Sequence, residues 1–188
     1  MSFFVTAADI LLPNKSIELE KFACIACDQF TSQKEYWEEL KRFVGDSPSA
    51  LNLILPEVYL SDDNSENIRR VNSAMESYLR QGIFEEHKSC MVYVERSTPY
   101  AGVRRGLVAA IDLEAYSFEE GAKTPIRASE GTVLSRIPPR VEIRKKAPLE
   151  LPHIMILIDD EERTVIEPLA SERLEPLYDT KLNMGGGS

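Results

Sequence analysis

The short polar run RASEGT holds the side chains of this sequence that are best suited to chemistry. Arg127 carries a planar guanidinium that matches phosphate or carboxylate oxygens, and the hydroxyls of Ser129 and Thr132 can add neutral hydrogen bonds. The carboxylate of Glu130 can orient a hydroxyl nucleophile, and the glycine beside it lets a ligand approach the backbone. The run therefore predicts an anion-binding loop. The structural alternative is a capped turn in which Arg127 pairs with Glu130.

Positive charge is concentrated around this run. Between Pro125 and Pro148 there are six basic residues against two acidic ones, in a chain whose net charge is −9. Such a local excess favours an anionic ligand, and we assign Arg140 to the same site. The basic triplet 144–146 lacks interleaved aromatic residues, which nucleic-acid binding would require, so we expect it to be a solvated face.

Asp28 lies in the tripeptide Cys-Asp-Gln just before a predicted helix. If its carboxylate faces a cleft, it can serve as a general base or a metal ligand. The alternative is a turn in which the carboxylate accepts hydrogen bonds from backbone donors, the commoner role of such residues. Both interpretations stay open.

Cysteine and histidine form two close pairs, Cys24 with Cys27 and His87 with Cys90. Four such ligands can hold a structural zinc ion, but buried cysteines that act as small hydrophobic residues explain the same pattern. We therefore assign no metal. The odd count of three cysteines indicates reduced thiols. No Ser-His-Asp pattern is present, and we expect His87 and His153 to be structural.

Two helices have clear periodic patterns. Aromatic and aliphatic residues recur at helical spacing from 36 to 44, after a capping-box pattern of Ser32 and Glu35 and before Gly45. The second helix spans 64–81 and ends at a glycine. Its apolar stripe predicts core packing rather than a partner groove, and it consists of Ile68, Val71, Met75, Tyr78 and Leu79.

Other apolar runs are too short for their period to distinguish a strand from a helix. We expect strands in five of them: 22–26, 51–55, the two halves of a hairpin at 90–95 and 105–112, and 153–158. The run 153–158 is continuously apolar, which is typical of a strand buried on both faces. A short helix is expected at 171–177, and the polar stretch 116–123 is expected on the surface.

Strands and helices interleave without strict βαβ alternation. The sequence therefore predicts an α/β or α+β protein, with a mixed sheet and flanking helices in a single compact domain. We expect that domain to cover residues 1–183, followed by a Gly-rich tail or cut loop at 184–188. No G-x-G-x-x-G or Walker A motif is present, which removes the two commonest nucleotide cradles.

Composition narrows the class further. The chain has 188 residues, of which 43% are hydrophobic and 28% are charged, so it can build a core. A strongly acidic surface repels nucleic acid and anionic membranes. The N-terminus lacks the features of a secretory signal, and no apolar run reaches the length of a membrane span. We therefore expect a cytoplasmic protein that binds neither nucleic acid nor membranes.

Several stretches together resemble the bacterial domain of unknown function 1015 family. They are CDQFTSQKEYWEEL, LNLILPEVYL, RRGLVAAIDLEAY and IRASEGTVLSRIPPRVEIRKKAPLELPHIMILIDD, and they occur in the family's order through most of the chain. The candidate residues that fall inside them, without a role assigned by the family, are Asp28, Arg105, Arg127, Glu130, Thr132 and Arg140.

The resemblance implies an N-terminal portion of a longer protein. Members of the family are typically longer, and their second half carries an Asp-Gly-His-His-Arg motif that this sequence lacks. That motif is similar to one in the ParB-like and sulfiredoxin-like group, which includes nucleotide-using proteins and a free-serine kinase. The resemblance therefore implies a chain that holds only part of a phosphate site.

Two functional hypotheses follow. In the first, the chain contributes to a nucleotide- or phosphate-binding site of kinase type, with ATP or ADP and Mg²⁺ as the cofactors. The arginines 105, 127 and 140, with Ser129 and Thr132, would bind the anion, while Asp28 or Glu130 would handle a proton or metal. In the second, it is a non-catalytic interaction or regulatory domain that docks a partner or its own missing C-terminal half. A homodimer is compatible with either hypothesis.

Overall fold

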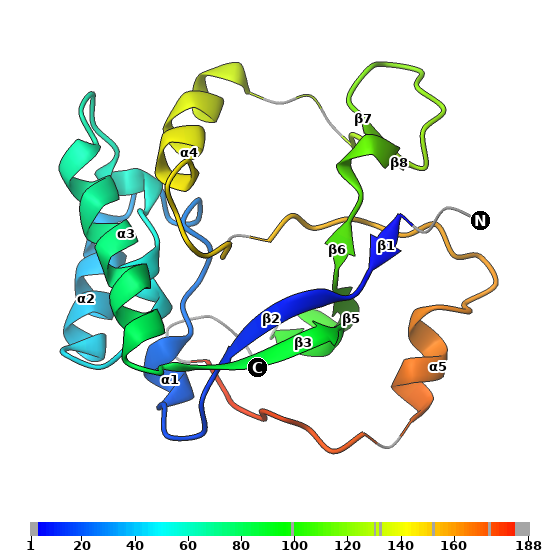
Figure 1. The fold of residues 1–188 in the computed structure, drawn as a ribbon, viewed down its shortest axis with the longest axis horizontal. Helices are drawn as coiled ribbons and strands as arrows, with labels where there is room; N and C mark the ends of the chain where they lie inside the picture. The colour runs from blue at the N-terminus through cyan, green and yellow to red at the C-terminus, as the bar shows by residue number, and fades with distance from the viewer. Residues whose placement is uncertain are drawn as a thin grey trace.

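The computed structural model describes residues 4–98, 100–129, 131, 133–151, 153–172 and 174–182 (Figure 1). Its helices are α1 Leu19–Phe22, α2 Lys34–Val44, α3 Ser65–Arg80, α4 Ile137–Arg144 and α5 Ile166–Ser171. Short 3₁₀ turns occur at Ala50–Leu53, Glu57–Tyr59, Leu113–Ala115 and Leu134–Arg136. Its strands are β1 Val5–Thr6, β2 Ala8–Pro13, β3 Phe84–Cys90, β4 Val92–Thr98, β5 Ala101–Val108, β6 Ala110–Ile111, β7 Tyr116–Ser117 and β8 Ile126–Arg127.

The two predicted amphipathic helices are confirmed as α2 and α3. Each buries residues spaced three or four apart, as a helix with one apolar face must. The buried residues are Trp37, Leu40 and Val44 on α2, and Val71, Met75 and Tyr78 on α3. Leu79 does not share that face: it is 41% exposed, because one residue beyond Tyr78 lies about 100° further round the helix.

The expected capping box at the start of α2 is wrong. The helix is preceded by Gln33, whose side chain makes no capping hydrogen bond, and Ser32 lies in the turn before it. The other end follows the sequence pattern. Gly45 adopts φ +56°, in the region that favours glycine, and its N–H donates to the carbonyl of Lys41.

The predicted strand 51–55 is instead a 3₁₀ turn that continues as a buried extended segment. Leu53, Ile54 and Leu55 are all buried, and they join the core residues of both α2 and α3. Consecutive residues can all be buried because the segment packs between two helices, so no ladder partner is needed. Periodicity could not distinguish this arrangement from a strand.

A buried tyrosine anchors the same segment. The hydroxyl of Tyr78 accepts a hydrogen bond from the backbone N–H of Ser49 at 2.9 Å and another from the side-chain amide of Asn52 at 3.0 Å. Ser49 is fully buried, so this N–H would otherwise have no partner from solvent.

The predicted strand 22–26 is also wrong, because α1 ends at Phe22 and residues 23–26 are irregular.

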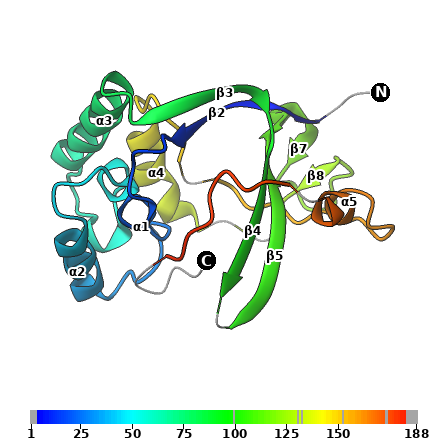
Figure 2. The same cartoon turned by 90° about the horizontal axis from the view of Figure 1, so that it is seen from below.

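The mixed α/β class is confirmed, and in the described part of the chain the strands form four two-stranded sheets rather than one. Antiparallel pairs join β1 to β6, β2 to β3 and β4 to β5, whereas β7 and β8 are parallel. The predicted hairpin is confirmed as β4–β5, with Val92 opposite Val108. Figure 2 shows these ribbons beside the helical part of the molecule.

The predicted buried strand 153–158 is the largest error. The segment has no regular structure, and its side chains are exposed: Ile154 by 72%, Met155 by 82% and Leu157 by 84%. A continuous apolar run is buried only where other elements of the chain pack against it. The helix expected at 171–177 is also wrong, since α5 ends at Ser171. The limits of the 1–183 domain stay a prediction.

Candidate functional site

Three segments distant in sequence meet at Arg140. Its Nη2 atom lies 2.6 Å from Oε1 of Glu57, to which it donates a hydrogen bond, and 3.6 Å from Oδ2 of Asp28. Arg140 lies on α4, Glu57 begins the 3₁₀ turn Glu57–Tyr59, and Asp28 follows the irregular segment after α1. We call these three residues the Arg140 cluster.

Local sequence explains how the cluster is held. The first turn of α4 contains Pro138 and Pro139, and proline is tolerated there because the first N–H groups of a helix have no intrahelical partner. Pro56 precedes Glu57, whose backbone N–H donates to the carbonyl of Cys27 at 2.8 Å. The two carboxylates are therefore joined through the backbone as well as through the arginine.

The Arg140 cluster carries one positive and two negative charges. Glu57 is the most buried member, with 14% of its side chain exposed. The hydrogen bond from Arg140 to Glu57 raises the arginine pKa above its ordinary value, and the charge of Asp28 adds to this effect. The guanidinium is thus neutralised by the chain itself. These contacts hold α4 against the segments around residues 28 and 57. Because the cluster has a net negative charge, it repels an added anion.

Two thiols lie beside the cluster. Burial raises the pKa of Cys24 to about 12, with a further contribution from Cys27. Burial also raises the pKa of Cys27, and the charges of Asp28 and Glu57 act in the same direction while Arg140 opposes them. Both thiols are therefore protonated at neutral pH. Since the thiolate is the nucleophile and the metal ligand, neither chemistry is favoured here.

Arg105 occupies a different part of the molecule. It lies on β5, directly opposite Glu95 of β4, and its Nε donates to Oε1 of Glu95 at 2.9 Å. The hydroxyl of Tyr93 donates to the same oxygen at 2.7 Å. These two hydrogen bonds, that of Tyr93 first, lower the pKa of Glu95. Like Arg140, Arg105 is already paired with a carboxylate of its own chain.

A cavity of about 290 Å³ lies between β5 and α5. It is lined by Val103, Arg105, Ile158, Asp160, Ile166 and Glu167. Asp160 is occupied, because its carboxylate accepts hydrogen bonds from the N–H groups of Thr164 and Val165 at 3.0 and 2.9 Å. With Arg105 and Asp160 both engaged, Glu167 is the one charged lining residue without a partner among the described residues, so the cavity lacks a converging set of free polar groups.

The polar run RASEGT begins at the last residue of β8. Arg127 ends that strand, and Arg127 and Ser129 are exposed. Among the residues that the structure describes, none forms an ion pair with Arg127. Glu130 and Thr132 lie outside the described residues, so their predicted roles stay predictions.

The predicted site residues are only partly brought together. Asp28 and Arg140 are neighbours, as the single-site hypothesis requires. Figures 1 and 2 both place β8 and the β4–β5 hairpin away from α4, on the side of the small sheets. Arg105, Arg127 and Arg140 therefore lie on three separate parts of the chain.

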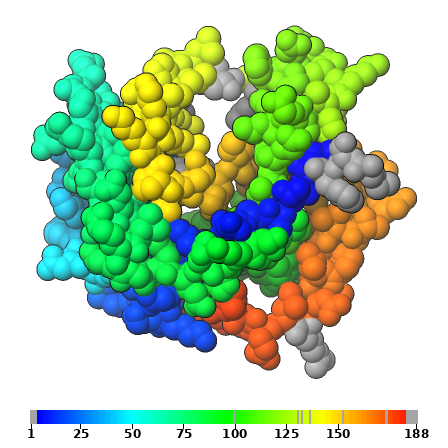
Figure 3. Space-filling model, in the orientation of Figure 1, coloured from blue at the N-terminus to red at the C-terminus, as the bar shows by residue number. Residues whose placement is uncertain are grey.

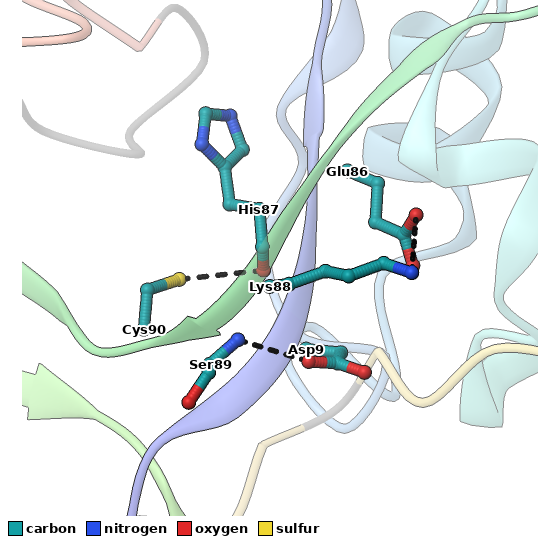
Figure 4. Close-up of polar contacts among 6 residues, drawn as sticks. All are labelled: Asp9, Glu86, His87, Lys88, Ser89 and Cys90. Atoms are coloured by element: carbon teal, nitrogen blue, oxygen red, sulfur yellow. Dashed lines mark hydrogen bonds and ion pairs between the residues drawn. The ribbon is translucent and has the colours of Figure 1, made fainter.

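Among the described residues, no group of three or more potential metal ligands converges, so the Cys24–Cys27 pair and the His87–Cys90 pair are not brought together as one ligand set. Figure 4 shows that the imidazole of His87 points away from the thiol of Cys90, which donates instead to the His87 carbonyl at 3.4 Å. The neighbouring Ser89 N–H donates to Asp9 at 2.9 Å, next to a register shift between β2 and β3.

Sequence reasoning missed two features. Glu57 is the main partner of Arg140, but a single glutamate after a proline carries no signal of that role. The second is the exposure of residues 153–158, because their apolar composition predicts a buried position. The four acids that follow them, residues 159–162, could have indicated proximity to solvent.

The fold and these contacts define a mixed α/β domain whose described candidate arginines on α4 and β5 are neutralised internally. A family model with the description "Protein of unknown function (DUF1015)" matches residues 11–188, and the chain therefore belongs to this family. No curated protein and no solved structure matches the chain. Among the described residues, the helices are too short or too polar to cross a lipid bilayer.

Proposed function

We propose that this chain is a non-catalytic interaction domain of the cytoplasm, and that it binds a protein partner which supplies an extended apolar strand. The docking element is the segment His153–Ile158, which we call the apolar segment. The observation that carries the proposal is its exposure, with Met155 and Leu157 both more than 80% accessible. Contiguous exposed apolar residues mark interaction surfaces in folded proteins.

Two further observations support this assignment. Arg140 and Arg105 are each neutralised by carboxylates of the chain, which leaves little free positive charge for a phosphate group at either position. Cys24 and Cys27 are free and their pKa values are raised, which suits a reducing compartment and argues against thiol catalysis.

Hydrogen exchange of the dilute chain tests the proposal. Backbone amides of residues 153–158 should exchange at close to the rate of an unstructured peptide, whereas those of α3 should be strongly protected. The amides of Glu120, Gly121 and Lys123, which are exposed and donate no hydrogen bond among the described residues, serve as the fast-exchanging reference. Slow exchange across 153–158 at high dilution would mean that the segment is buried within its own chain, and the proposal would be rejected.

A nucleotide or phosphate site at β8 is the second candidate. The observation that favours it is the exposed guanidinium of Arg127, unpaired among the described residues, with Ser129 two residues further on. This candidate retains the kinase-type hypothesis with ATP or ADP and Mg²⁺, and the suggested kinship with the ParB-like and sulfiredoxin-like group agrees with it. Asp28 would have no part, because it lies beside Arg140.

A thermal-shift series with ATP, ADP and inorganic phosphate, each with and without Mg²⁺, tests this second candidate. Binding at β8 should raise the melting temperature of the native chain, and Arg127→Ala should abolish the rise. Lys146→Ala is the matched control, since it removes the same charge from an exposed position in the turn after α4. Equal responses from both variants would eliminate the β8 site.

A further inference from the structure

The apolar segment has no regular structure, but it presents unpaired backbone groups like those of a sheet edge. Its six residues are all exposed, and within the described chain neither their backbone nor their side chains take part in a hydrogen bond. It therefore presents unpaired N–H and C=O groups together with five consecutive apolar side chains. Such an edge is a template for pairing with another strand.

The chain as a whole exposes more surface than a compact monomer of its mass. Its accessible area is 14075 Å², whereas a compact monomer of this mass exposes roughly 9,000 Å². A standard interface buries only about 800 Å² on each partner. Figure 3 shows the surface hollowed between α4 and the strands β6 and β7, so the excess area is not confined to protruding tails.

The negative charge that follows the segment selects a direction of pairing between two copies. His153 precedes the apolar residues, and the four acids 159–162 follow them. A parallel, in-register pair of identical segments would place the two sets of acids side by side, which is repulsive. An antiparallel pair places the imidazole side of one copy beside the acidic side of the other. Asp159, the first of these acids, is exposed. The carboxylate of Asp160 already accepts hydrogen bonds from the backbone N–H groups of Thr164 and Val165.

We propose that the partner is a second copy of this chain, and that two apolar segments pair antiparallel across a two-fold axis at Ile156. This inference rests on the proposed interaction function and specifies its partner. Ile154 of one copy then lies opposite Ile158 of the other, and His153 lies opposite Asp159. The pairing satisfies backbone groups on both chains and buries the apolar side chains against each other. A symmetric interface of this kind closes at two copies.

Cysteine cross-linking tests the register. Residues directly opposite in an antiparallel pair have Cα atoms about 4.5–5.5 Å apart, within the range that a disulfide needs. Under mild oxidation, Ile156→Cys should give a covalent dimer on a non-reducing gel. Leu113→Cys, an apolar residue that is 70% exposed and lies elsewhere, is the control, and the native chain controls for its own three cysteines. Equal cross-linking of Ile156→Cys and Leu113→Cys overturns the register.

Light scattering and hydrogen exchange on the native chain separate this inference from the function on which it rests. A dimer whose 153–158 amides become protected as concentration rises supports both. A monomer with freely exchanging 153–158 amides rejects the second copy and leaves the interaction function standing. A monomer with protected 153–158 amides rejects both.

Met155→Asp, at an exposed position, should weaken dimerisation at least tenfold, and an unchanged dimer rules out the apolar segment as the interface.

Discussion

Arg140 and Glu57 are joined by a 2.6 Å hydrogen bond across 83 residues of sequence. The bond connects α4 to the turn that follows the buried segment of the core. Arg140 belongs to the most basic part of the sequence. Because its guanidinium is paired with Glu57 of the same chain, it has a structural role and is not free to bind a ligand.

Breaking this pair should destabilise the fold. Arg140→Ala leaves the largely covered carboxylate of Glu57 without its donor, while Glu57→Gln removes the charge with little change of shape. Since Arg140 is about half exposed, we expect a coupling free energy of about 1 kcal/mol in a double-mutant cycle measured by urea unfolding. Lys145→Ala is the control, because its pair with Glu142 is exposed on both sides and should contribute less than about 0.5 kcal/mol. A coupling no larger than the effect of that control would contradict a structural role.

The hydrogen bond from Ser49 to Tyr78 predicts a larger effect from a smaller change. Tyr78→Phe removes one oxygen and leaves the buried N–H of Ser49 without an acceptor. We expect a loss of about 1–3 kcal/mol in the free energy of unfolding. Tyr100→Phe is the matched control, since Tyr100 is 98% exposed, and it should be neutral. Equal stability of the two variants would show that the N–H of Ser49 finds another partner.

Alkaline pH should destabilise the chain through Cys24. In the folded state the pKa of this thiol is about 12, whereas its ordinary value is near 9. Between these values the folded state keeps a proton that the unfolded state has released, so stability falls as pH rises above about 9. The limiting slope is about 1.4 kcal/mol per pH unit for one proton.

Comparing variants isolates that slope. Urea unfolding between pH 8.5 and 10.5 should show a shallower decline for Cys24→Ala than for the native chain, whatever the stability of the variant at pH 7. Cys90→Ala, which removes a thiol outside the Cys24 and Cys27 pair, should retain the native slope. Parallel declines in all three proteins would mean that Cys24 is not the group responsible.

Gly45 should be intolerant of a side chain despite having space for one. Its φ of +56° lies in the region that L residues rarely adopt, although nothing lies within 4 Å of a Cβ placed there. Gly45→Ala should therefore destabilise the chain by about 1–2 kcal/mol through backbone strain alone. Gly102→Ala has equal space and no positive φ, so a clear difference between their thermal midpoints is the expected result.

The parts of the fold that the sequence predicted correctly have either a periodic apolar pattern over a long stretch or a clear turn signal. The helices α2 and α3 run for three turns or more, and the β4–β5 hairpin is marked by a proline and a glycine. Runs of five or six apolar residues were misassigned, because their burial depends on which elements cover them. Residues 51–55 are covered by two helices without being a strand, and residues 153–158 are not covered in the chain.

The candidate site was predictable only as a set of residue types. Local charge drew attention to Arg140 and turn chemistry drew attention to Asp28, and the two are neighbours. Which acid would neutralise Arg140 depended on a contact across 83 residues, which spacing cannot reveal. Arg105 shows the same limit on a smaller scale, since its partner Glu95 is fixed by the hairpin register.

The pairing of β2 with β3 also bears on how the chain is made. Residues 8–13 leave the ribosome early, but their partners at 84–90 are synthesised only after both core helices. The helical half has mostly short-range contacts, so it can fold before β3 is available to pair with β2. The hydrogen bond from the hydroxyl of Tyr178 to the carbonyl of Pro13 can form only after residue 178 has been synthesised. Synthesis that stops just after α3 leaves β2 without a partner strand, so its aliphatic residues become a target for chaperones.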